Sequence, residues 1–505
     1  MSLDLGKYEW ILKRLPRPML QWLEGRLKQN PKTLALIQKE EEKVEQLLEH
    51  SLKPYRNRFE RRFQLPRQAV QKEDILNELK KMNELETPRW KEGYVSGGIY
   101  HGDAAHISFL NEVYALQSQS NPLHMDLFPS ATKFEAEIVS MVRSLLCEEG
   151  HPQSHRITGT VSSGGTESIL LAMKTYRDWG LKFKGIKKPE IIAPMTAHVA
   201  FDKAAHYFGL SLIKIPVDQT YRVDVAQVKR AITSRTVALV GSAPSFPHGV
   251  IDPISELSAL AVQANVGLHV DACLGGFILP FARKLGVAVP EFDFRLPGVT
   301  SISVDTHKYG YAAKGTSVVL YRNEEFQHEQ YFTATEWPGG LYFSPTLAGS
   351  RPGALSAACW ASLLAMGEDG YLRSTRAILE AADRIKQGIR EIPELKILGE
   401  PLWIIAFGSD DLNIYQLLDG LSQKGWSLNG LHHPPCIHIA LTLRHTEAGV
   451  VERFLEDLKD SVAQVRSGSV SQGGMAPVYG MASSLPFRGM ISDLLKKTLD
   501  VIYRV

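Results

Sequence analysis

Cysteine is scarce in this chain, which has four among 505 residues. The four are scattered and have no short paired spacing, which excludes a disulfide framework and a cysteine-rich zinc site. This usage is typical of a reducing compartment, so we expect a cytoplasmic location. The cysteines are Cys147, Cys273, Cys359 and Cys436.

Surplus charge and long apolar runs are also missing. A formal net charge of +2 gives no reason to expect binding to nucleic acid. No segment approaches the roughly 18 to 20 apolar residues of a membrane-spanning helix, and the start lacks a signal-peptide pattern, so we expect no transmembrane anchor. The basic, amphipathic stretches 8–15 and 19–23 leave two interpretations open, peripheral contact with a membrane surface and packing on a partner subunit. We favour packing.

The chain is rich in short, patterned apolar segments. Hydrophobic residues make up 44% of it, enough for a sizeable core. From about residue 130 to 355, apolar runs alternate with helical patterns, which predicts a mainly parallel sheet covered on both faces. We predict a helical N-terminal segment (1–85), an α/β large domain (86–355) and an α+β small domain (356–505).

Lys308 is the first sign of chemistry. It lies in residues 305–309, Asp-Thr-His-Lys-Tyr, directly after the apolar run 299–304. A lysine forms an imine with an aldehyde when burial or nearby positive charge leaves part of its amine neutral. His307 and Lys314 could supply that charge. Alone this motif is weak evidence, because most lysines after a strand are solvated.

Asp271 follows a second apolar run, residues 266–270, which is typical of a buried strand. Ligand-binding groups collect at the carboxyl ends of strands in open parallel sheets. The carboxylate is either an ordinary helix-capping acid or the partner that keeps the pyridine nitrogen of pyridoxal phosphate protonated. The small residues 272–276 leave room for a flat ring.

A phosphate seat is predicted earlier in the chain. Residues 161–168, Val-Ser-Ser-Gly-Gly-Thr-Glu-Ser, open an apolar helical run, so hydroxyls and unpaired N–H groups meet at a positive helix end. The motif lacks the spacing that binds ATP or NAD. His198, between this motif and Asp271, either stacks on a cofactor ring or caps a helix. The phosphate seat, the imidazole, the carboxylate and the lysine follow one another in this order. Chance is much less able to explain all four in this order than any one of them alone.

Several longer motifs resemble the sphingosine-1-phosphate lyases, pyridoxal-phosphate enzymes related to the group II amino-acid decarboxylases. The resemblance runs from about residue 90 to the C-terminus. It implies a PLP-dependent transferase-like α/β fold, called fold type I, with a mainly parallel sheet of the seven-stranded type, a smaller α+β C-terminal domain and pyridoxal 5'-phosphate as cofactor. The matching segments are 94–100, 121–124, 164–168, 246–253, 269–277, 303–311, 348–353 and 479–482.

The resemblance implies roles around the cofactor. Lys308 would hold it as an imine, Asp271 would pair with its ring nitrogen, and His198 would stack on the ring. Ser350 would reach the phosphate of the neighbouring subunit's cofactor, which implies a homodimer with sites at the interface. The remaining predicted cofactor-binding residues are Gly164, Gly165, Thr166 and His307.

The implied reaction is a retro-aldol cleavage of the C2–C3 bond of a phosphorylated sphingoid base, giving phosphoethanolamine and a long-chain aldehyde. Neutral Lys308, a histidine or a cofactor phosphate oxygen could each take the proton of the C3 hydroxyl. Lys314 is also predicted to be catalytic, because an anionic substrate head beside an anionic cofactor needs a cation. The residues expected around the substrate phosphate are Tyr100, His124, Lys314 and Tyr479.

Two other functions compete with the lyase. A group II decarboxylase uses the same imine, carboxylate and phosphate seat, but the lyase-type segments around Tyr100 and His124 favour the lyase. A catalytically silent, lipid-binding dimer is disfavoured by the intact Lys308 and Asp271. No metal is predicted, because the histidine-rich segment 432–438 contains two prolines and fits a loop that enters a sheet.

Overall fold

A computed structural model describes residues 16–31, 35, 39, 49, 52–147, 154–469 and 488–505. Contacts divide the chain into two compact units, Met1–Arg89 with Val470–Val505, and Trp90–Ser469. In the part of the chain that the structure describes, no helix has the length and apolar character needed to cross a membrane.

The described part of the first unit contains helices and a stretch of turns and irregular backbone at 53–71. Its helices are α2 (Arg17–Gln29), most of α4 (Lys72–Lys91) and α17 (Arg488–Tyr503). An ion pair joins α2 to α17, with Lys28 Nζ 2.7 Å from Asp493 Oδ2. Of the two amphipathic stretches, 8–15 lies outside the described residues, and 19–23 lies in α2.

The second unit is built on a seven-stranded sheet of order β1-β7-β6-β5-β4-β2-β3. Strands β3, β2, β4, β5 and β6 run parallel to one another, and β7 runs antiparallel to both β1 and β6. The prediction of a mainly parallel sheet is confirmed. The strands are β1 (Thr158–Ser162), β2 (Glu190–Pro194), β3 (Ser211–Ile215), β4 (Thr236–Ser242), β5 (Gly267–Asp271), β6 (Ser301–Val304) and β7 (Ser317–Tyr321).

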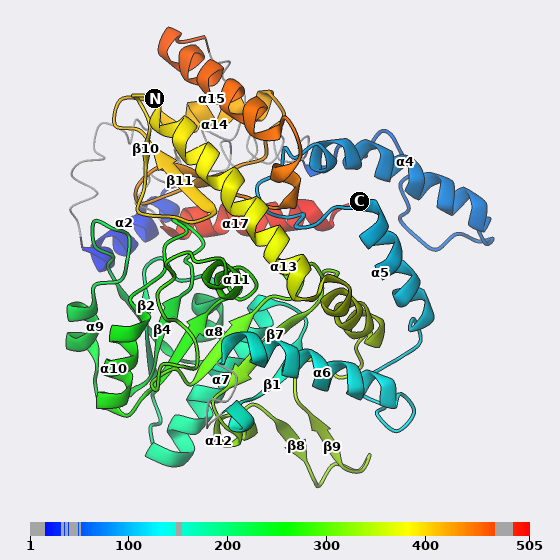
Figure 1. The fold of residues 1–505 in the computed structure, drawn as a ribbon, viewed down its shortest axis with the longest axis vertical. Coiled ribbons are helices and arrows are strands. Elements are labelled where there is room, and N and C mark those ends of the chain that lie inside the picture. Colours follow the sequence, from blue (N-terminus) through cyan, green and yellow to red (C-terminus); the bar gives the residue numbers. More distant parts are fainter. Residues whose placement is uncertain are drawn as a thin grey trace. The chain divides into compact units, whose positions relative to one another are not determined.

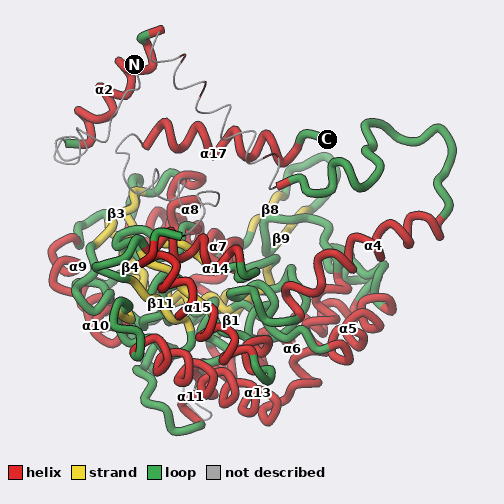
Figure 2. The backbone as a smooth tube through the Cα atoms, turned by 90° about the horizontal axis from the view of Figure 1, so that it is seen from above, coloured by secondary structure: helices red, strands yellow, loops and turns green. Residues whose placement is uncertain are grey.

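Helices surround these strands (Figures 1 and 2), which explains why the central strands β4, β5 and β6 are buried along their whole length. Helix α7 is largely buried, and its Tyr176 lies fully inside the core. A Cβ on Gly267 would overlap the Tyr176 ring, so glycine lets helix and sheet pack closely. The helices are α5 (Ala104–Leu116), α6 (Pro129–Leu146), η2 (Ser154–Arg156), α7 (Gly165–Lys184), α8 (Ala200–Phe208), α9 (Val225–Ala231), α10 (Ile254–Ala264), α11 (Leu279–Lys284) and α12 (Glu324–His328).

A long helix, α13 (Gly353–Arg390), connects this sheet to a second one and is interrupted at Gly367, where φ is +55° (yellow to olive in Figure 1). The second sheet is antiparallel, of order β10-β11-β13-β12, and packs against α13 and α14, which in turn contact α15. Its elements are β10 (Lys396–Ile397), β11 (Ile404–Gly408), α14 (Ile414–Gln423), β12 (Asn429–Leu431), β13 (Cys436–Ala440), η3 (Leu443–Thr446) and α15 (Val450–Ser467).

A two-stranded ribbon, β8 (Phe332–Ala334) with β9 (Tyr342–Ser344), precedes the Ser350 loop. The histidine-rich segment forms the turn that enters β13, as predicted. The domain limits at residues 85 and 355 stay predictions.

Candidate active site

The carboxyl ends of the central strands and the N-terminus of α7 enclose a cavity of about 430 Å³. Four separate loops, which follow β1, β2, β5 and β6, supply the predicted residues that line it. The structure thus brings together groups that are far apart in the sequence. These residues are Gly164, Gly165, Thr166, His198, Asp271, His307 and Lys308.

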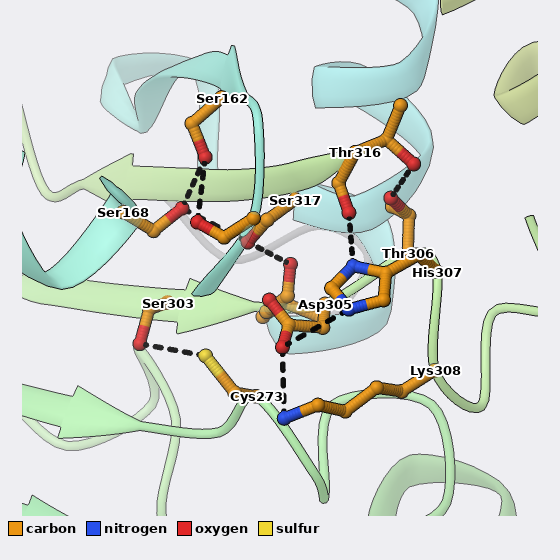
Figure 3. A network of polar contacts seen from close by, with 12 residues as sticks. Ser162, Ser168, Cys273, Ser303, Asp305, Thr306, His307, Lys308, Thr316 and Ser317 are labelled. Carbon is orange, nitrogen blue, oxygen red and sulfur yellow. Dashed lines mark hydrogen bonds and ion pairs between the residues drawn. The ribbon is translucent and has the colours of Figure 1, made fainter. Parts of the chain in front are cut away.

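The predicted phosphate seat forms the turn from β1 into α7. Its serines make a buried chain of hydroxyl hydrogen bonds, from Ser162 to Ser168 at 2.7 Å and from Ser168 to Ser317 on β7 at 2.9 Å (Figure 3). The Glu167 carboxylate accepts the N–H of Ser163 at 2.7 Å. The seat is therefore fixed to the sheet, while a twenty-residue helix directs its unpaired first-turn N–H groups at the cavity.

Gly165 packs against the floor of the cavity. A Cβ at this position would lie 2.7 Å from both carboxylate oxygens of Asp305 and 2.8 Å from Cys273 Sγ. Only glycine lets the seat approach this floor so closely.

Asp271 is the last residue of β5, and its side chain lines the cavity. Its Oδ1 accepts the N–H of Cys273 at 3.1 Å and lies 3.5 Å from Ser303 Oγ. The next described helix, α11, begins eight residues later, so Asp271 does not cap a helix. The carboxylate is held toward the cavity.

His198 contacts the start of a helix, as one of its two predicted interpretations requires, and its stacking on a cofactor ring stays a prediction. Its Nδ1 accepts the N–H of Ala200, the first residue of α8, at 3.1 Å, and its ring lines the cavity edge-on to Phe246. Because Nδ1 is an acceptor, the neutral ring carries its proton on Nε2.

Lys308 forms an ion pair that the sequence interpretation did not anticipate. Its Nζ lies 2.9 Å from Asp305 Oδ2, and Asp305 is only 2% exposed (Figure 3). Burial opposes the charged lysine, yet the pKa of Lys308 is raised above its ordinary value, and attraction to the Asp305 carboxylate is the largest of the effects that raise it. The effect expected from His307 and Lys314, a partly neutral lysine, is thereby reversed.

His307 supports the same cluster. Its Nδ1 donates to the Thr316 carbonyl at 2.6 Å, and its Nε2 lies 4.0 Å from Asp305 Oδ2. Burial, which outweighs the attraction of Asp305, lowers the pKa of His307. The ring is therefore neutral near pH 7.

Lys314 and Tyr100 form a second group. The Lys314 Nζ lies 4.6 Å from the centre of the Tyr100 ring, and that ring packs edge-on against Tyr309. Desolvation first, and repulsion by Lys308 second, lower the pKa of Lys314 to about 8. These side chains supply a cation and an aromatic hydroxyl for an anionic group.

Besides Tyr100 and Lys314, three further predicted residues are not among those that line the cavity. His124 and Ser350 are exposed, and Tyr479 lies outside the described residues. The loops of His124 and Ser350 are joined, because Asn121 Oδ1 accepts the N–H of Arg351 at 3.3 Å from within the His124 loop. Arg351 is further held by a two-pronged ion pair with Glu135.

The chain matches a family model described as the pyridoxal-dependent decarboxylase conserved domain, over residues 56–407. It is 46% identical to a sphingosine-1-phosphate lyase of Arabidopsis thaliana over 97% of this chain and 90% of that protein. A sphingosine-1-phosphate lyase of Dictyostelium discoideum is 48% identical over 87% of this chain and 82% of that one. The chain belongs to the sphingosine-1-phosphate lyase family.

Solved structures agree with this membership. The sphingosine-1-phosphate lyase of Burkholderia pseudomallei K96243 matches with a TM-score of 0.84 and 43% identity, over 89% of this chain and 99% of that chain. A glutamate decarboxylase of Lactobacillus brevis, 20% identical with a TM-score of 0.69, shares the fold. The fold type I prediction is confirmed.

Membership in the sphingosine-1-phosphate lyase family implies pyridoxal 5'-phosphate as cofactor. The residues present fit this group. The α7 N-terminus suits its phosphate, Asp271 its ring nitrogen and Lys308 its aldehyde, and a Cβ on Gly165 would narrow the seat.

Asp305 is the site residue that sequence reasoning missed in this lyase-family chain, although it stood inside the lysine motif. The signal was its position, since Asp305 directly follows β6 as Asp271 ends β5. Both carboxylates therefore lie at carboxyl ends of neighbouring parallel strands.

Proposed function

We propose that this protein is a sphingosine-1-phosphate lyase that cleaves the C2–C3 bond of phosphorylated sphingoid bases to phosphoethanolamine and a long-chain aldehyde. One observation carries the proposal. A chain that matches lyases over nearly its whole length keeps Lys308, Asp271 and the α7 N-terminus around one cavity, with Lys314 close by.

Each of these residues has a task in a retro-aldol cleavage. Bound pyridoxal phosphate supplies an electron-poor ring that accepts the electron pair of the breaking C2–C3 bond. Asp271 holds a proton on the ring nitrogen, because a carboxylate stabilises the positive charge there. The N–H groups that open α7 bind the cofactor phosphate, and His198 orients the ring from the cavity wall.

Selectivity for a phosphorylated substrate rests on Lys314. Its ammonium lies against Tyr100, and a second anion beside the cofactor phosphate needs such a cation. His124 and Tyr479 are proposed to complete the binding of the substrate phosphate. A group II decarboxylase would instead break the bond from Cα to a carboxylate, and the identities of 46% and 48% to lyases favour the lyase.

We also propose that the protein works as a homodimer. An apolar cavity of about 520 Å³ lies between α5, α6 and α13, with Phe109 and Leu364 exposed in its lining. A second copy of the chain is the proposed occupant of this face, because Ser350 is exposed on a loop that directly precedes α13. Ser350 would then reach the partner's cofactor phosphate.

A cytoplasmic location is proposed as well. All four cysteines are free and buried, which suits a reducing compartment.

The assay is direct. Purified protein loaded with pyridoxal phosphate is given sphingosine 1-phosphate, and mass spectrometry follows phosphoethanolamine and the aldehyde. The wild-type protein is expected to form both products. Lys308→Ala is expected to lose both products and the covalently held cofactor. The control Lys284→Ala, which changes an exposed lysine paired with Glu368, is expected to keep the products and the cofactor. Failure of the loaded wild-type protein to form the products, or undiminished turnover by Lys308→Ala, would contradict the proposal.

A further inference from the structure

A second carboxylate, Asp305, lies on the floor of the cavity in direct contact with Lys308. It follows β6, is 2% exposed, and places Oδ2 at 2.9 Å from the lysine nitrogen (Figure 3). It is distinct from Asp271, whose Oδ1 is engaged by Cys273 and Ser303. The two aspartates of the cavity therefore have different neighbours.

The ionised state of Asp305 depends on Lys308. A buried carboxylate is costly unless it is paired, and among the described residues its Oδ1 has no hydrogen-bond partner. Burial acts to raise the pKa of Asp305, but the charge of Lys308, helped by His307, holds it below its ordinary value. Each charge thus stabilises the other.

The remaining groups around Lys308 do not replace this partner. Burial raises the pKa of the Cys273 thiol and of the Tyr100 hydroxyl, so both are neutral near pH 7. His307 is neutral there too, and Lys314 repels the Lys308 ammonium. Asp271 lines the same cavity but makes its closest described contacts elsewhere.

We propose that Asp305 is a positioning residue that keeps the Lys308 nitrogen protonated from its displacement by the substrate until C2 is protonated, so that Lys308 gives a proton to C2 and does not take one from the C3 hydroxyl. The inference rests on the proposed lyase reaction.

The protons balance in this scheme. When the substrate ammonium displaces Lys308, the lysine nitrogen leaves with the hydrogens that the substrate nitrogen gives up and pairs with Asp305. During cleavage the hydroxyl proton goes to another acceptor, a neutral imidazole or a phosphate oxygen, as C3–O becomes a carbonyl. One N–H bond of Lys308 then breaks as the C2–H bond forms. The lysine is left neutral and able to displace the product amine, which takes the proton from that acceptor.

The test measures the charge of Lys308 without turnover. The full chain, stripped of cofactor, is acetylated with trace acetic anhydride from pH 6 to 11, and mass spectrometry follows the peptides that carry Lys308 and Lys314. Wild-type Lys308 is expected to react later in the pH series than an ordinary lysine, and Lys314 earlier. Asp305→Asn is expected to speed acetylation of Lys308 at pH 8 by about tenfold or more, since losing an opposite charge shifts a pKa by a unit or more.

Two controls separate charge from damage to the fold. Asp271→Asn removes a carboxylate from the same cavity and is expected to leave the rate for Lys308 within about twofold, and Asp305→Glu is expected to restore the slow rate. Ordinary or early acetylation of Lys308 in the wild-type protein would overturn the inference, and this measurement needs no variant. An unchanged rate in a folded Asp305→Asn would overturn it as well. Slow acetylation of Lys308 in a protein that forms no lyase products would contradict the proposed function but not the role of Asp305.

Discussion

Lys308 and Lys314 lie in one site, yet their surroundings shift their pKa values in opposite directions. Asp305 raises the pKa of Lys308 against the effect of burial, whereas burial and the Lys308 charge lower the pKa of Lys314 to about 8. The free Lys308 amine is charged near neutral pH, whereas Lys314 titrates just above it. Two lysines six residues apart thus serve different purposes.

The pH dependence of the enzyme is expected to report Lys314. A lysine with a pKa of about 8 is charged below that pH and neutral above it, so kcat/KM for the phosphorylated base is expected to fall as pH rises past 8. Lys314→Arg keeps its charge and is expected to move this fall to higher pH, while Lys314→Ala is expected to lose most of the preference for the phosphorylated base. Steady-state kinetics from pH 6.5 to 9.5 check this, and identical profiles for wild type and Lys314→Arg would count against it.

The sequence predicted which residues form the site but not the charge state of Lys308. The order of motifs predicted Gly165, His198, Asp271 and Lys308, and the structure brings all four to one cavity. The charge state of Lys308 depends on which oxygen lies within 3 Å of its nitrogen, and spacing along the chain does not carry that information. Roles assigned to the four residues stay predictions until they are measured.

Among the elements, α7 needs a glycine at each of its two ends. Its first residue faces Asp305 and Cys273, and its C-terminal end is followed by Gly185 in a left-handed conformation with open space around it. The two glycines are required for different reasons, close approach at one end and backbone conformation at the other.

These two glycines allow a matched experiment. Gly165→Ala is expected to weaken cofactor binding by about tenfold or more, because overpacking costs about 1 to 3 kcal/mol and 1.4 kcal/mol is tenfold in affinity. Gly185→Ala is expected to lower the free energy of unfolding by about 1 kcal/mol and to leave cofactor affinity unchanged. Absorbance titration with pyridoxal phosphate and thermal melts distinguish the two effects. Equal cofactor affinities in both variants would contradict the proposed seat.

The elements themselves were largely readable from the sequence. Short, mainly apolar runs form strands such as β4 and β5, because a strand covered on both faces is buried along its whole length. The antiparallel placement of β7 between β1 and β6 was not readable, since pairing is decided by tertiary packing.

At the scale of the whole molecule, the proposed dimer makes a prediction of its own. If Ser350 serves the partner's site, a dimer of one Lys308→Ala chain and one Ser350→Glu chain has one complete site, because the second chain keeps its lysine and receives an intact serine. Co-expressed chains with two tags are expected to recover up to about half of the wild-type activity per dimer, while each variant alone is much less active. An inactive mixed dimer would place Ser350 in its own subunit's site or outside it. Position along the chain could not reveal this, because the subunit that a loop serves is decided by assembly.

The strand order also sets a length. The phosphate seat follows β1 and the lysine follows β6, and both strands are hydrogen-bonded to β7. Adjacent strands are about 4.8 Å apart, so the strands that carry the two cofactor anchors are two inter-strand spacings, or about 10 Å, apart. The distance between the two anchors is therefore set by backbone hydrogen bonds between the strands. Substitutions of side chains around the site can therefore change its substrate preference. The distance between the two cofactor anchors stays the same, because the backbone sets it.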